Sequence, residues 1–145
     1  MFKKFLVPVI GILLIAGCNE EKNDSAVTHA LQEINRPTIY YFHGNIMCLS
    51  CHKIENYTKQ VFDQNFKNKA DFKVINIDKP ENKHFVTDYN LYTQSIILVK
   101  PNLGHGSEYK NLDKTWTYIE NEAKFKSYIN YEINSFLFGQ EIGRA

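Results

Sequence analysis

Two cysteines three residues apart, Cys48 and Cys51, are the residues of this chain best suited to do chemistry. They follow an aromatic and β-branched run at 39–42 and the turn residues Gly44 and Asn45, and they precede a segment with helical spacing. We therefore expect a strand to lead into a helix at the cysteines. Because unpaired N–H groups at a helix start favour a thiolate, the first cysteine is the expected nucleophile. The second lies one helical turn later, so the pair predicts a reversible disulfide.

Other uses of this segment compete with dithiol exchange. A structural zinc site needs four ligands, and the chain has no second pair of cysteines. The run Cys48-x-x-Cys51-His52 is also the pattern of c-type haem attachment, with His52 as the axial ligand. A copper carrier would combine the cysteines with Met47, His52 and His43, since copper prefers sulfur and imidazole ligands. A purely structural disulfide gains little, because the loop it closes is very short. We expect no cofactor, with copper or haem as the alternative.

The N-terminus has the pattern of an export signal. Two lysines precede an apolar run at 5–16, and the small residue Gly17 precedes Cys18. This pattern predicts a signal peptide at residues 1–17, which is too short for a confident membrane span. The letters LIAGC at 14–18 resemble the bacterial lipobox, so Cys18 is expected to carry lipid, with a plain secretory signal or an uncleaved anchor as alternatives. The protein would then be anchored in the bacterial cell envelope outside the cytoplasm, facing the periplasm in a Gram-negative cell, where disulfides persist.

The mature chain is expected to be one domain with nearly balanced charge. Residues 1–17 contain two of the 17 basic side chains and none of the 16 acidic ones, so the remainder has a formal charge of −1. This balance does not suggest a nucleic acid as partner. We expect a lipid-bearing tether at 18–37, a folded domain at 38–138 and a C-terminal tail at 139–145. The 14% aromatic content is ample for a hydrophobic core.

Strands and helices are expected to alternate along the domain. Apolar patterns predict strands at 39–42, 71–78 and 95–99. A short antiparallel strand is expected at 108–110, because it follows a hairpin turn at 104–107. Helical spacing predicts helices from the dithiol to about 66, at 81–89 and at 122–137. Gly139 is expected to end the last helix, His105 to lie in a hairpin turn, and Trp116 to pack as a lid on the core. This order resembles the thioredoxin fold, an α/β three-layer fold with a central mixed sheet of about four strands flanked by helices.

More narrowly, the chain resembles the ArsF family, described as subunits associated with the reduction of nitrophenyl compounds. The resemblance rests on YYFHGNIMCLSCHKIE, on INIDKPENKHFVTDYNLYTQSIILV, and on KNLDKTWTYI followed by FKSYINYEI. These stretches span nearly all of residues 38–137. The resemblance implies the fold and a redox role for Cys48 and Cys51.

The chain departs from thioredoxins proper around the expected site. Thioredoxins usually carry a cis-proline just before the central strand, and here the matching residue is about Gln94, followed by Ser95. Met47 replaces the usual tryptophan, and Leu49-Ser50 replaces Gly-Pro between the cysteines. Substrate backbone is therefore expected to be held differently.

Thioredoxins also bury an aspartate six residues before the first cysteine, and that position here is Phe42. Proton transfer to and from Cys51 then needs another group. His52 and His43 are candidates, because imidazole titrates near neutral pH. A protonated His52 would also lower the pKa of the thiols.

The expected mechanism is attack by Cys48 on a partner disulfide, followed by resolution of the mixed disulfide by Cys51. A lipid on Cys18 would raise the effective concentration of the dithiol near the membrane. The expected partners are a membrane electron-donor protein and exported disulfide-containing proteins. A further alternative is a non-catalytic subunit whose fold only docks a partner.

Overall fold

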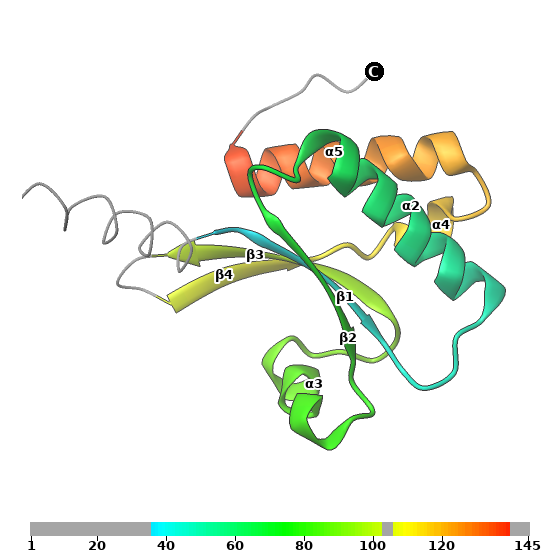
Figure 1. Cartoon of the computed structure of the whole chain (residues 1–145), viewed down its shortest axis with the longest axis vertical. Helices are drawn as coiled ribbons and strands as arrows, with labels where there is room; N and C mark the ends of the chain where they lie inside the picture. Colours follow the sequence, from blue (N-terminus) through cyan, green and yellow to red (C-terminus); the bar gives the residue numbers. More distant parts are fainter. Residues whose placement is uncertain (1–35, 103–105, 140–145) are drawn as a thin grey trace, which may run out of the picture.

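The computed structural model describes residues 36–102 and 106–139, which form a sheet with helices on both of its faces (Figure 1). The expected signal peptide, Cys18, nearly all of the tether, His105 and the tail beyond Gly139 lie outside the described residues. Within the described ranges, no helix is both long and apolar enough to cross a membrane.

The order of strands and helices predicted from the sequence is confirmed. The elements are β1 (Thr38–His43), α2 (Leu49–Asn65), β2 (Asp71–Asn76), the 3-10 turn η1 (Pro80–Asn82), α3 (His84–Asp88), β3 (Ser95–Asn102), β4 (Gly106–Asn111), α4 (Thr115–Tyr118) and α5 (Glu122–Phe138). The structure differs from the prediction in detail: the helix expected at 81–89 is divided into η1 and α3, and α4 was not predicted. Strands β3 and β4 are longer than expected.

The four strands form one mixed sheet in the order β2-β1-β3-β4. β1 and β2 are parallel, and α2 connects them; β1 pairs with β3, and β3 with β4, in antiparallel register. Tyr41 at the centre of β1 is opposite Val74 on one side and Ile96 on the other. This strand order, with helices on both faces, is the thioredoxin-like arrangement.

Alternate residues of β1 face opposite sides of the sheet, which creates two hydrophobic clusters. Helices α2 and α5 lie on one face and α3 on the other (Figure 1). The larger cluster contains Ile39, Tyr41, Ile54, Val61, Phe62, Phe66, Ala70, Ile96, Leu98, Leu112, Ile119, Phe125, Ile129, Ile133 and Leu137. The smaller one contains Phe42, Leu91, Ile97 and Val99. The larger cluster thus includes residues of α2 and packs this helix against the sheet.

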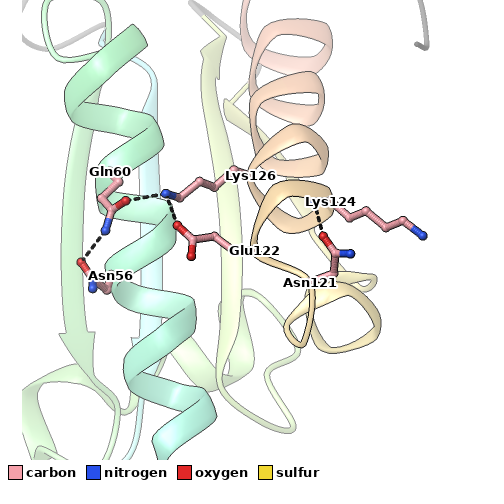
Figure 2. A network of polar contacts seen from close by, with 6 residues as sticks. All are labelled: Asn56, Gln60, Asn121, Glu122, Lys124 and Lys126. Atoms are coloured by element: carbon pink, nitrogen blue, oxygen red, sulfur yellow. Dashed lines mark hydrogen bonds and ion pairs between the residues drawn. The ribbon is translucent and has the colours of Figure 1, made fainter.

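The last helix has distinct caps and a polar connection to α2. Asn121 caps α5 by accepting from the N–H of Lys124, and Gly139 ends it with a left-handed backbone, φ +62°. The prediction that Gly139 ends this helix is confirmed. Figure 2 shows Lys126 of α5 donating to Glu122 of its own helix and to Gln60 of α2. Lys126 therefore connects α5 to α2 through a polar contact.

Candidate active site

Cys48 and Cys51 form a disulfide, with their Cα atoms 4.9 Å apart. Cys48 is exposed at the N-cap of α2, whereas Cys51 lies in the first turn with 1% of its surface exposed. The sulfur of Cys48 is therefore the one that a partner can reach. The sulfur of Cys51 is accessible to Cys48 but hardly to solvent.

The start of α2 favours negative charge on Cys48. Its sulfur accepts a hydrogen bond from the N–H of Cys51 at 3.1 Å, in the position where a serine or aspartate oxygen usually caps a helix. No acidic residue lies in the first turn to oppose a negative sulfur. Once the disulfide is opened, this N–H and the positive end of the helix stabilise a thiolate more than a thiol.

Tyr41 lies beneath the buried cysteine, a placement that the sequence analysis missed. Its hydroxyl donates to the main-chain carbonyl of Cys51 at 3.0 Å, and its side chain is fully buried. Burial, and to a smaller degree the charge of Glu55, raise the pKa of Tyr41 well above its usual range. Tyr41 therefore stays protonated and acts as a hydrogen-bond donor rather than as a base.

Phe42, which stands where thioredoxins have the buried aspartate, points away from the dithiol. Its side chain belongs to the smaller cluster on the α3 face and packs 5.2 Å from the ring of Phe85. Strand alternation explains both placements, since Tyr41 and its neighbour must face opposite sides. An acid at position 42 would thus not reach Cys51.

Gln94 is brought to the disulfide by the loop before β3. Its Oε1 lies 3.1 Å from Sγ of Cys51, although the two residues are 43 positions apart, and its Nε2 donates to the carbonyl of Ile46 at 3.2 Å. Ser95, the first residue of β3, is buried, and its hydroxyl donates to the carbonyl of Thr93 at 2.9 Å. Of these two expected neighbours, Gln94 is therefore the one whose side chain contacts a cysteine.

Trp116 does not cover the core, so that prediction was wrong. It is 38% exposed, and its Nε1 donates to the main-chain carbonyl of Gln94 at 3.2 Å. The reason is that Thr115 of the single-turn helix α4 and Ile119, the residue after it, are both buried, so the tryptophan projects toward the loop before β3. Trp116 consequently holds the main chain of Gln94, next to the disulfide, by a hydrogen bond.

The other expected neighbours lie near the dithiol with different partners. Met47 is half-buried against the larger cluster. His43 stacks on Tyr41, with ring centroids 5.9 Å apart, and its Nδ1 donates to the carbonyl of Gly44 at 2.8 Å. His52 is exposed on α2. Neither imidazole hydrogen bonds to a cysteine sulfur within the described residues.

A polar clasp holds the loop that leads to Cys48. Asp78 accepts from the N–H of Asn45 at 2.7 Å, and Asn76 donates from its side chain to Asn45 at 2.9 Å. A Cβ on Gly44 would meet the Asp78 carboxylate at 2.9 Å, so a larger residue here would require that carboxylate to shift away from its contact with Asn45. The loop is thereby fixed to the end of β2.

Large apolar side chains lie exposed beside the disulfide. Ile46 is 84% and Leu49 85% exposed, on either side of Cys48 in the chain. Tyr92, 95% exposed, belongs to the loop that carries Gln94. These three side chains are free to contact another molecule. No group of three or more His, Cys, Asp or Glu side chains in the described ranges is arranged to hold a metal ion.

No family model matches the chain, and no curated protein matches it either. Solved structures similar to it include a thioredoxin from Thermus thermophilus, with 11% identity over 71% of this chain and 85% of that chain and a TM-score of 0.39. A thioredoxin from Fasciola hepatica has 16% identity over 70% and 94% of the two chains, with a TM-score of 0.40. The reduced C-terminal domain of Neisseria meningitidis DsbD has 21% identity over 69% and 90%, with a TM-score of 0.40. The fold assignment rests on the strand order and helix placement described above.

Proposed function

We propose that the protein is a membrane-anchored, extracytoplasmic thiol-disulfide oxidoreductase that exchanges electrons with partner proteins through Cys48 and Cys51. The observation that carries the proposal is the unequal placement of two bonded sulfurs. One lies exposed at the N-cap of α2, and the other lies buried one turn later. A disulfide with only a structural role would need neither exposure nor the helix N–H at its outer sulfur.

The exchange follows from this placement. In the reduced protein, the Cys48 thiolate attacks one sulfur of a partner disulfide, so the partner S–S bond breaks and its second sulfur leaves as a thiolate that takes up a proton. Cys51 then loses its proton and attacks Cys48 within the mixed disulfide, which releases the first partner sulfur. The partner gains two electrons and two protons, and the protein returns to the disulfide form.

The exposed apolar side chains supply a contact surface for such a partner. Ile46 and Leu49 flank the reactive sulfur in the chain, and Tyr92 extends from the neighbouring loop. Contact with apolar residues around a partner cysteine would bury these three side chains, a favourable term of about 25 cal/mol for each Å² removed from water. We infer that the partner disulfide lies in an apolar surface.

The cellular setting is a proposal from the sequence. The lipobox at 14–18 supports lipid attachment at Cys18, which would confine the dithiol to a layer beside the membrane. A membrane protein would then supply electrons, and exported disulfide-containing proteins would receive them. The resemblance to the ArsF family supports a place among such anchored redox subunits, with no contact to nucleic acid.

Reduction of insulin disulfides by the full-length protein, with dithiothreitol as electron donor, tests the activity. Cys48→Ser should abolish it. Cys51→Ser, first reduced and then freed of dithiothreitol, should accumulate a mixed disulfide with insulin because the resolving thiol is missing. Cys18→Ala is the matched control and should keep the activity in detergent solution. Full activity of Cys48→Ser would reject the nucleophile assignment. A haem absorption spectrum or stoichiometric copper in the same sample would instead favour a carrier.

A further inference from the structure

The side chain of Gln94 joins the two halves of the site. Its Nε2 donates to the carbonyl of Ile46 in the loop before α2, and its Oε1 lies 3.1 Å from the sulfur of Cys51 in the first turn of α2. Its main-chain carbonyl is held by Nε1 of Trp116. Two contacts of its side chain and one of its main chain thus hold this residue beside the buried sulfur.

The partners of the amide fix which end faces the cysteine. A carbonyl oxygen can only accept, so Ile46 requires the NH₂ end, and the oxygen of Gln94 is left facing Cys51. In the disulfide, Cys51 has no proton to donate to that oxygen. In the dithiol, the same sulfur carries S–H and has an acceptor already in place.

We propose that Gln94 is a positioning residue that accepts a hydrogen bond from the thiol of Cys51 in the reduced protein and so keeps this cysteine neutral while Cys48 ionises. The proposal rests on the function proposed above and specifies how its two thiols differ. Reduction by two electrons and one proton breaks the S–S bond and leaves a thiolate at Cys48 and a thiol at Cys51. A hydrogen bond to the neutral form stabilises that form, and burial of Cys51 acts in the same direction.

The groups around Cys51 leave this role to Gln94. From β1, the Tyr41 hydroxyl donates to the main-chain carbonyl of Cys51 rather than to its sulfur. From α2, the neighbours are Cys48 and the exposed His52. Within the described residues, no charged side chain pairs or hydrogen bonds with Cys51. The amide oxygen is therefore the acceptor available to its thiol.

Two substitutions at Gln94 predict shifts of opposite sign. The full chain with Cys18→Ala and Cys48→Ser has Cys51 as its only thiol, and its alkylation by iodoacetamide is followed against pH. Gln94→Met removes the acceptor and should move the midpoint to lower pH, with an about fivefold larger thiolate fraction below the midpoint. Gln94→Glu places a negative charge there and should move the midpoint to higher pH. Both variants lose the contact with Ile46. If loosening of that loop were the cause, the alkylation midpoints of both variants would shift in the same direction.

Thr93→Ala is the matched control, since this neighbour in the same loop is exposed and should leave the midpoint unchanged. Equilibration of the protein that retains Cys48 and Cys51 with glutathione gives a second measurement. Gln94→Met destabilises the dithiol alone, so the equilibrium should move about fivefold toward the disulfide, a potential lower by about 20 mV. Shifts of the same sign in both variants, or an unchanged midpoint in Gln94→Met, would overturn the proposal. Absence of insulin reduction would instead reject the exchange function, because ionisation of Cys51 is measured without a partner.

Discussion

Substituting Phe42 by aspartate tests whether an acid six residues before the first cysteine can serve this site. Phe42 is fully buried on the α3 face, where its ring packs 5.3 Å from Tyr40, 5.2 Å from Phe85 and 5.6 Å from Tyr89. An aspartate there would face those rings and not Cys51. We therefore expect Phe42→Asp to destabilise the fold without supplying a base for exchange.

The size of the effect has two parts. Loss of the ring costs about 3–5 kcal/mol, as for other large aromatic truncations in cores. Burial of the carboxyl without a partner raises its folded-state pKa above the unfolded value of about 3.9. Between those two pKa values the folded state binds more protons than the unfolded state. The free energy of unfolding therefore falls by about 1.4 kcal/mol for each unit by which the pH rises through this range. The destabilisation should therefore be present at neutral pH. It should diminish as the pH is lowered toward the unfolded pKa of about 3.9, so that it is already smaller at pH 5.

Urea unfolding of the disulfide form at pH 7 and pH 5 measures both parts. Phe42→Asn has nearly the size of aspartate and no charge, so it should show the loss from the missing ring at both pH values. The difference between Phe42→Asp and Phe42→Asn should be large at pH 7 and smaller at pH 5. A stable Phe42→Asp protein that exchanges disulfides faster than the parent would refute the placement of this residue.

Two further substitutions test the contacts around α2. Tyr41→Phe removes the hydroxyl that donates to the Cys51 carbonyl, and it should lower the free energy of unfolding in urea by about 1 kcal/mol. The loss should be equal at pH 6 and pH 8, because the raised pKa of Tyr41 keeps its hydroxyl protonated at both. Lys126→Met removes the connection in Figure 2 and should lower the urea midpoint slightly, more at low salt than at high salt. Lys126 lowers the pKa of Glu122, so this small stabilisation should be lost as the pH falls through that pKa; an effect that persists in acid would contradict it.

The fold could be predicted because burial leaves a period in the sequence. The continuous apolar run at 95–99 became the central strand β3, and the last helix was found from its apolar face. Trp116 was misplaced because a single turn of helix carries no such period. The buried positions of α4 and the residue after it, Thr115 and Ile119, determine where the indole points, and only the folded chain reveals that choice.

The two cysteines were predictable from their spacing, whereas the surroundings of Cys51 were only partly so. Gln94 was singled out by its place before the central strand, but no local pattern indicates a contact between residues 43 positions apart. Tyr41 was missed even though strand alternation contains the signal: it shares the face of Ile39, which packs under α2.

The different roles of the two sulfurs follow from the phase of α2. Cys51 belongs to the buried stripe of this helix, which continues through Ile54, Thr58, Val61 and Phe62. Any residue on that stripe must face the sheet, so Cys51 is desolvated by the same packing that holds the helix in place. Cys48 has the extended backbone of an N-cap, φ −82° and ψ 168°, and therefore lies outside the helical stripe. One helix boundary thus leaves one sulfur exposed at the N-cap of α2, and it buries the other beside Gln94.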